Sequence, residues 1–331
     1  MGQVGIIVNP EAGKDIRRLV AMGISSSHSE KVNILRRVLT GLDAVGMDEV
    51  LLMPEAVGIG PAALGGLGER VREKVRFIPM RTTATAEDST RAARLMRERG
   101  VRCIITVGGD GTCRAVAKEA GDVALLPIST GTNNVFPKFI EGTVAGMAAG
   151  LFALKGELSP FRRRAKRLEV LKGGSVFDIA LIDAAFYDAA FQGSRAIWEL
   201  ERVRGLVLTQ GLPSSIGLSA IGGFLEPVGP WEERGLYLRF AQDGGGLPVM
   251  APIGPGLLAE ASVEEVQALP LGTCVAVEPA PCMLALDGER EIYVGRGEEV
   301  RLRLSGEGPW VLDLEAVLKE SAEKGLLRPC D

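Results

Sequence analysis

The chain has few of the residues that build soft-metal and nucleophilic sites. Its 331 residues include a single histidine and five cysteines, and no two cysteines form a C-x-x-C pair. Zinc sites and disulfide frameworks need such clusters, and a Ser-His-Asp triad would have only His28 to draw on. The sequence therefore offers no metal-ligating cluster, and its odd number of cysteines is typical of a reducing compartment.

Long apolar runs and an excess of positive charge are also missing. The stretch 143–154 is too short to span a bilayer, and the first residues lack the pattern of a signal peptide. Lys and Arg number 38 against 42 Asp and Glu, a net charge of −4, whereas a non-specific nucleic-acid binder is usually basic. We therefore expect a cytoplasmic protein that binds neither nucleic acid nor membrane.

Aromatic residues are scarce at 5%, while glycine is abundant with 43 residues. The hydrophobic content of 46% is enough for a folded core and excludes intrinsic disorder. At this length about two domains are expected. Glycine is costly where it is not needed, so its abundance indicates tight turns or close approach of backbone to a ligand.

Strand-like and helix-like segments alternate in the first half of the chain. Apolar strand candidates cover residues 4–8, 49–53, 75–79, 101–107 and 123–128, with helical periodicity between them at 29–42, 62–73, 85–99, 112–119 and 143–155. This alternation predicts an α/β amino-terminal domain with an open, mostly parallel, Rossmann-like sheet over residues 1–158. Short alternating runs separated by turns predict an all-β carboxy-terminal domain over 159–331, with a final helix near 314–324.

One glycine-rich loop stands out because it follows a buried strand and opens a helix. It reads Gly108-Gly109-Asp110-Gly111-Thr112. In an open α/β sheet, ligands bind where strands end, and a helix N-terminus attracts anions. A carboxylate at Asp110 suits a residue that holds a metal ion or accepts a proton from a hydroxyl. The alternative is a plain βα turn in which Asp110 caps the helix.

A second polar loop follows the next strand. It contains Thr130, Gly131, Thr132 and Asn133, and adjacent strand ends can share one crevice, so this loop is expected to face Asp110. The alternative is a simple turn, because Asn and Gly favour turns. Two other nucleotide motifs are absent: residues 11–15 lack the first glycine and the Ser/Thr of a P-loop, and no G-x-G-x-x-G follows the first strand.

The order of these motifs, beginning with Asn9-Pro10 after the first strand, resembles the NAD kinase/diacylglycerol kinase superfamily. The chain is similar in particular to the ATP-NAD kinase-like proteins of the acetoin-catabolism X type. The resemblance covers nearly the whole chain, including a turn that begins Leu286-Asp287-Gly288. It implies an NAD kinase-like fold with the active site between an α/β and an all-β domain.

The resemblance also implies a function. The expected reaction is magnesium-assisted phosphoryl transfer from ATP or polyphosphate to a hydroxyl of NAD or a related nucleotide, with small-molecule nucleotides as the partners and a homo-oligomer as the assembly. Asp110 would be the base or hydroxyl-orienting residue. The resemblance places the nucleotide and its phosphates against Asn9, Gly108, Gly109, Gly111, Thr112, Thr130, Gly131, Thr132 and Asn133.

The second half departs from true NAD kinases at the acceptor side. Their Asn-Glu pair is replaced by a stretch offering only Asp183, and their Gly-Ser-Thr-Ala-Tyr stretch by residues 213–220, which contain Ser219 but no tyrosine. Asp183 and Ser219 are the acceptor-binding candidates, with capped turns as the alternative for each. These departures leave open a nucleotide-binding accessory protein without turnover, and a lipid kinase is disfavoured because no basic amphipathic helix is evident.

A basic run, residues 162–167, lies at the expected domain boundary. Such a run is usually a solvated linker. The alternative is that one of its members reaches the site and neutralises phosphate.

Overall fold

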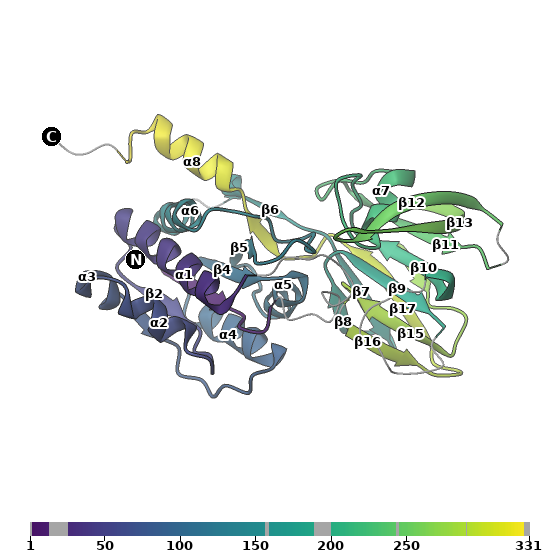
Figure 1. The fold of residues 1–331 in the computed structure, drawn as a ribbon, viewed down its shortest axis with the longest axis horizontal. Helices are drawn as coiled ribbons and strands as arrows, with labels where there is room; N and C mark the ends of the chain where they lie inside the picture. The colour runs from purple at the N-terminus through teal and green to yellow at the C-terminus, as the bar shows by residue number, and fades with distance from the viewer. Residues whose placement is uncertain are drawn as a thin grey trace.

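The computed structural model describes residues 2–12, 26–155, 159–188, 200–242, 245–288 and 290–327 of the chain. Two parts lie side by side, an α/β part that contains the N-terminus and a part made almost wholly of strands (Figure 1). The fold class expected from the sequence is confirmed.

The α/β part is built on a seven-stranded sheet of order β3-β2-β1-β4-β5-β18-β6. All neighbours are parallel except β18 and β6. The strands are β1 (Val4–Val8), β2 (Val50–Leu52), β3 (Val75–Phe77), β4 (Cys103–Gly108), β5 (Ala124–Ser129), β18 (Trp310–Leu312) and β6 (Arg162–Arg164). The three central strands β1, β4 and β5 are buried along their whole length, as expected of parallel strands covered on both faces.

Helices cover both faces of this sheet. One core joins the sheet to α1 (His28–Ala44), α2 (Ile59–Gly65), α6 (Gly142–Leu154) and α8 (Leu314–Glu323). A second core, on the other face, joins it to α4 (Ala86–Glu98) and α5 (Asp110–Ala117). The helix expected over 62–73 is instead two, α2 and the short α3 (Glu69–Arg72), because glycines at 65, 66 and 68 interrupt the run.

Part of the glycine excess serves helix packing. Helices α1 and α6 approach so closely that a Cβ at Gly146 would lie 2.1 Å from the Val38 carbonyl oxygen, and a Cβ at Gly41 would lie 2.1 Å from that of Thr143. Any larger residue at these two positions would force the helices apart. These glycines therefore bring α6 onto α1, a use that the sequence analysis did not anticipate.

The second part is a sandwich of two antiparallel sheets. The larger has order β12-β13-β11-β10-β9-β15-β16 and the smaller β14-β17-β7-β8. Their strands are β7 (Arg167–Lys172), β8 (Ser175–Ala180), β9 (Asp183–Tyr187), β10 (Val203–Leu208), β11 (Arg234–Phe240), β12 (Leu247–Gly254), β13 (Leu257–Pro270), β14 (Cys274–Ala276), β15 (Cys282–Leu286), β16 (Arg290–Val294) and β17 (Val300–Ser305). One core fills the space between the sheets, and another lies under α7 (Ser219–Leu225) on the outer face of the larger sheet.

The chain crosses between the two parts twice. It leaves the first sheet through a single turn of 3-10 helix (Ser159–Phe161) and β6, and it returns at its end through β18 and α8. The sequence analysis placed 159–331 in one all-β domain, yet β6, β18 and α8 belong with the first sheet. Which sheet a short strand joins is decided by tertiary pairing, so the local pattern could not reveal that return.

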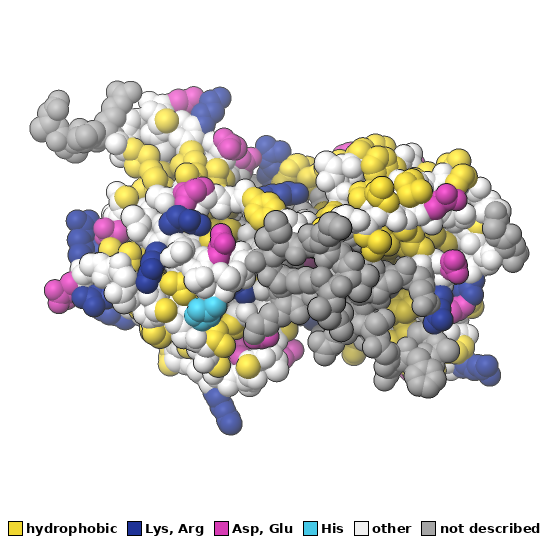
Figure 2. All heavy atoms as spheres, in the orientation of Figure 1, with side chains coloured by type: hydrophobic (Ala, Val, Ile, Leu, Met, Phe, Trp, Pro, Cys, Tyr) yellow, Lys and Arg dark blue, Asp and Glu magenta, His cyan; other side chains and the backbone are white. Residues whose placement is uncertain are grey.

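Hydrophobic side chains gather on the surface over β12, β13 and α7 (Figure 2). Leu247, Met250 and Leu258 are each more than half exposed there, and Phe224 of α7 is 49% exposed. Strand β12 is also an edge of its sheet. Among the described residues, no helix is both long and apolar enough to cross a membrane.

Candidate functional site

The centre of the first sheet is the point at which the strand order reverses. The chain runs from β1 outward to β2 and β3, returns to pair β4 with β1, and then continues in the opposite direction to β5. In open α/β sheets, ligands bind outside the carboxyl ends of the strands at such a switch point. Asn9 follows β1 directly and the glycine loop follows β4, so two of the predicted motifs flank this point.

The glycine loop is tightly built. Strand β4 ends at Gly108, Gly109 is the N-cap of α5, and Asp110 is the first helical residue. A Cβ at Gly108 would lie 2.4 Å from the Thr112 hydroxyl oxygen, and one at Gly109 would lie 2.8 Å from Asn134 Oδ1. Both distances are shorter than real Cβ contacts, so neither position has room for a side chain without displacing a neighbour.

The first turn of α5 presents backbone donors. The N–H groups of the first residues of a helix have no carbonyl within the helix to accept them, and the helix dipole adds partial positive charge there. Gly111 is half-buried and Thr112 is buried within this turn. The loop therefore has the properties of an anion site.

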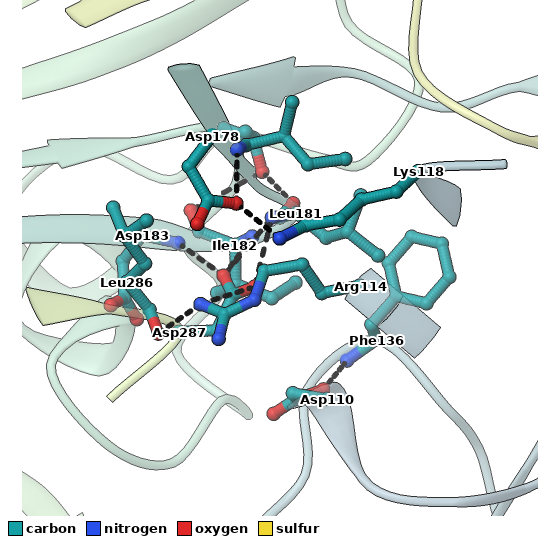
Figure 3. Close-up of polar contacts among 12 residues, drawn as sticks. Asp110, Arg114, Lys118, Phe136, Asp178, Leu181, Ile182, Asp183, Leu286 and Asp287 are labelled. Atoms are coloured by element: carbon teal, nitrogen blue, oxygen red, sulfur yellow. Dashed lines mark hydrogen bonds and ion pairs between the residues drawn. The ribbon is translucent and has the colours of Figure 1, made fainter. Parts of the chain in front are cut away.

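The Asp110 carboxylate joins this helix to the second polar loop. It is 7% exposed and accepts hydrogen bonds from the backbone N–H of Val135, at 3.0 and 3.1 Å, and of Phe136, at 2.7 Å. Figure 3 shows Asp110 directed at Phe136 from the start of its helix. The carboxylate thus holds the loop in place, and its action as a base stays a prediction.

The second loop lies against the first, as the strand order requires. The Thr130 N–H donates to the Gly108 carbonyl at 3.2 Å. The Asn134 side-chain amide bridges the Ser129 hydroxyl and the Gly131 carbonyl at 2.8 and 3.2 Å. Two βα loops that are separate in sequence therefore form one structure.

The predicted ligands on the second loop differ in exposure. Thr130 is buried, at 2% exposed, whereas Gly131, Thr132 and Asn133 are half-buried. Gly131, Thr132 and Asn133 thus expose part of their surface, whereas Thr130 does not.

Asn9 ties β1 to α5. Its Nδ2 donates to the Thr112 hydroxyl at 2.9 Å, and its Oδ1 accepts from the Glu11 N–H at 2.9 Å. Its own N–H donates to the Val107 carbonyl at 3.1 Å. Asn9 therefore orients Thr112 and the end of β1. Its predicted contact with a nucleotide would use the hydrogen-bonding capacity of the side-chain amide that these two contacts leave free.

Helix α5 also fastens the α/β part to the sandwich. Arg114 donates to the Leu286 carbonyl at 2.6 Å and lies 3.9 Å from a carboxylate oxygen of Asp287. One turn later, Lys118 forms an ion pair with Asp178 of β8 at 2.6 Å. Figure 3 shows both cations reaching from this helix to the strands of the second part. The helix that begins at the glycine loop is thus fixed to both parts.

Asp287 is the centre of that connection. Its backbone is left-handed, with φ of 52°, and its carboxylate accepts hydrogen bonds from the N–H groups of Leu181, Ile182 and Asp183 at 3.0, 2.8 and 3.3 Å. Burial raises the pKa of this carboxyl, and Arg114 and the backbone donors oppose that effect. The turn beginning at Leu286, which carried part of the resemblance, therefore has a structural role.

The two acceptor candidates lie in different surroundings. Asp183 is buried at the start of β9, where its backbone exchanges hydrogen bonds with Asp287. Ser219 is fully buried in the first turn of α7 and donates to the Ile216 carbonyl at 3.4 Å. Figure 1 places α7 on the outer side of the sandwich, away from α5. The structure brings Asp183 close to the α5 contacts and leaves Ser219 apart from them.

The basic run proves to be part of the fold. Arg162, Arg163 and Arg164 form β6. The guanidinium groups of Arg162 and Arg164 lie 4.4 and 5.3 Å from the ring centre of Trp310 in the neighbouring strand, and Arg163 pairs with Asp313 at 3.0 Å. These contacts hold the returning end of the chain, so Arg162, Arg163 and Arg164 form a strand of the first sheet and not a linker.

Sequence reasoning missed the residues that join the two parts. Arg114 and Lys118 stand four residues apart, which places them on one face of the helix that follows the glycine loop. That spacing was the available signal. Their partners Asp178 and Asp287 could not be found in the same way, because they come from distant strands.

Comparison with known proteins is consistent with this arrangement. Residues 4–155 match the model of the ATP-NAD kinase N-terminal domain, and residues 166–307 match that of the acetoin catabolism protein X C-terminal domain. Among solved structures, a putative diacylglycerol kinase from Bacillus anthracis is 13% identical with a TM-score of 0.50, covering 94% of this chain and 97% of that one. An NAD kinase from Archaeoglobus fulgidus in complex with ATP is 12% identical with a TM-score of 0.46, covering 99% of this chain and 100% of that one.

A curated relative resembles the chain over nearly its whole length. The acetoin catabolism protein X of Cupriavidus necator is 38% identical over 337 aligned positions, which cover 98% of this chain and 94% of the relative. The resemblance inferred from the motif order is thereby confirmed. The chain belongs to the acetoin catabolism protein X family, and its first half matches the ATP-NAD kinase N-terminal domain.

Proposed function

We propose that this protein is a phosphotransferase that binds ATP with its phosphates at the first turn of α5. The observation that carries the proposal is the glycine loop at the switch point of the sheet, where β4 ends at Gly108 and α5 begins at Asp110. Phosphoryl transfer relies on positioning and on electrostatic stabilisation of the phosphates rather than on covalent chemistry by the protein. A glycine-lined helix start supplies that environment.

Magnesium fits the site as a companion of the nucleotide. Among the described residues, no group of three or more His, Cys, Asp or Glu side chains is placed to hold a metal ion. Mg²⁺ usually keeps several waters and binds through one or two carboxylates together with substrate phosphates. Asp110 is the carboxylate beside the loop, and polyphosphate would offer the same phosphate chemistry as ATP.

The acceptor is a hydroxyl compound, with NAD as the first candidate. The name of the Cupriavidus necator relative places it in acetoin catabolism, so we place this protein in the same metabolic context. Asp183 is the better acceptor candidate because it lies beside the α5 connection, whereas Ser219 lies in α7, on the outer face of the sandwich.

A transfer assay tests the proposal. Purified protein is incubated with Mg²⁺, ATP labelled in its γ-phosphate and a panel of hydroxyl acceptors that includes NAD. We expect a labelled product, and we expect Asp110→Asn to lower its rate about 100-fold or more, as loss of a general base does. The matched control is Asp48→Asn, a carboxylate on the exposed surface. Equal rates for the two variants would remove Asp110 from the reaction.

A second candidate function is a nucleotide-binding accessory protein without turnover. The observation that favours it is the engagement of Asp110 by the Val135 and Phe136 N–H groups, which occupies the expected base. This alternative predicts that ATP, NAD or NADP raises the melting temperature of the protein. The same acceptor panel would then yield no labelled product at any protein concentration.

A further inference from the structure

A cavity lies where the first sheet meets the sandwich, beside the proposed nucleotide site. Its volume is about 160 Å³, and it is lined chiefly by apolar side chains of both parts. Leu126, Val135 and Leu312 come from the α/β part, while Leu181 and Trp231 come from the sandwich. Neither the glycine loop nor the other predicted phosphate ligands line it.

One buried cation faces this apolar space. Lys166, at 5% exposed, lines the cavity from the link between β6 and β7. Its Nζ donates to the carbonyl oxygens of Gly229 at 2.9 Å and Arg234 at 2.5 Å. A lysine ammonium has three N–H donors, so two are engaged and one is left. Within the described part of the chain, no carboxylate forms an ion pair with Lys166.

A second polar side chain in the wall also lacks a partner. Gln210, at 7% exposed, lines the same cavity, and in the described ranges its side-chain amide makes no hydrogen bond. The nearby Thr209 hydroxyl is already committed, because it donates to the Leu181 carbonyl at 2.7 Å. The remaining ammonium donor of Lys166 and the amide of Gln210 therefore offer a ligand two polar contacts in an otherwise apolar wall, which is the usual make-up of a small-molecule site.

The size of the space limits what that ligand can be. An engineered apolar cavity of about 150 Å³ accommodates benzene, so this one holds a body of about the size of a six-membered ring. We infer that the cavity binds a small apolar carboxylate, with its ring or branched chain among the apolar side chains and its carboxylate on Lys166 Nζ and the Gln210 amide. A charge-assisted hydrogen bond in an apolar setting gives the carboxylate its selectivity over a neutral isostere.

The charge state of Lys166 supplies a pH signature. Burial lowers the pKa of Lys166 to about 8, an effect that Arg234 reinforces and Glu232 opposes. Lys138, whose Nζ donates to the Val135 carbonyl at 2.9 Å, is the other cation in the wall. Carboxylate binding should therefore weaken as the pH rises through about 8, because Lys166 loses its proton there while the ligand stays ionised.

Benzoate and its neutral isostere benzamide are suitable probes for calorimetric titration of the whole chain at pH 7. We expect benzoate to bind at least about tenfold more tightly than benzamide, a difference of about 1.4 kcal/mol, and to lose that advantage in Lys166→Met. The matched control is Lys172→Met, which removes an exposed lysine paired with Glu298. Melting curves of the free proteins report whether each variant folds.

A second variant keeps the inference testable if Lys166→Met does not fold. Ala165 also lines the cavity, and Ala165→Leu should fill part of it and abolish benzoate binding with the lysine still present. Benzoate binding that is undetectable in the wild-type protein, equal to that of benzamide, or unchanged in either cavity variant would overturn the inference. None of these outcomes depends on phosphoryl transfer.

Discussion

Among single residues, half-buried Asn9 connects two elements of the candidate site. Its side chain links the Thr112 hydroxyl to the Glu11 N–H, and so joins β1 to α5. We expect Asn9→Ala to lower the free energy of unfolding by about 1–2 kcal/mol, because two hydrogen bonds, one of them part-buried, are lost. Urea denaturation measures this, with Asn33→Ala on the exposed side of α1 as control; equal midpoints for the two variants would contradict the role given to Asn9.

The sequence was most informative about residues at this scale. Gly108, Gly109 and Asp110 were identified because glycine and a carboxylate at a strand end are unusual together, and steric contacts now explain both glycines. The partners of Asp110 were not predicted. They are the backbone N–H groups of Val135 and Phe136, and backbone groups leave no trace in residue identity.

Among the elements, α5 connects the proposed phosphate site to the sandwich. Arg114 and Asp287 are 8% and 0% exposed in their side chains. We expect Arg114→Met to lower the free energy of unfolding by about 3 kcal/mol or more, because it leaves a buried carboxylate without its cation. Denaturation at neutral pH measures this. Arg94→Met, on the surface of α4 and 4.0 Å from Glu98, is a control of little effect.

The stability of the same variant should also depend on pH in a different way from that of the wild type. Burial already raises the pKa of Asp287 above its usual 3.8, and Arg114 opposes that rise. Without Arg114 the folded state holds a proton on Asp287 at a pH where the unfolded state has lost it, so stability falls as the pH rises above the unfolded pKa. The loss of unfolding free energy in Arg114→Met, relative to wild type, should therefore be smaller near pH 4 than at neutral pH. A deficit that is constant from pH 4 to pH 7 would show that packing, not charge, is lost.

The positions of the strands in the first half were predicted well, and the sheet that the last strand joins was not. The strand Val4–Val8 has the predicted bounds, and β4 and β5 lie within a few residues of theirs. Strand β6 was not predicted, and β18 was predicted as a strand-like run at 311–314 but was assigned to the all-β domain. The contacts of Arg162 and Arg164 with the Trp310 ring join distant parts of the chain. A local sequence pattern cannot predict such tertiary contacts.

For the whole molecule, we expect a homo-oligomer formed through β12. This edge strand has unpaired backbone groups, and Met250 and Leu258 expose apolar surface beside it. A second copy that pairs its own β12 with this edge would cover both the unpaired backbone groups and the apolar surface. Light scattering after gel filtration should give at least a dimer for the wild type and a folded monomer for Met250→Asp combined with Leu258→Asp. A monomeric wild type, or an unchanged mass in the double variant, would rule this surface out.

The central claim is that nucleotide phosphates bind at the start of α5, and titration with Mg-ATP tests it most directly. Gly109→Ala and Gly68→Ala change two N-cap glycines: a Cβ at Gly109 meets Asn134 at 2.8 Å, and one at Gly68 meets open space. We predict that wild type and Gly68→Ala bind Mg-ATP equally, and that Gly109→Ala binds about tenfold more weakly. Equal affinities for all three proteins, or no binding by wild type, would contradict the claim.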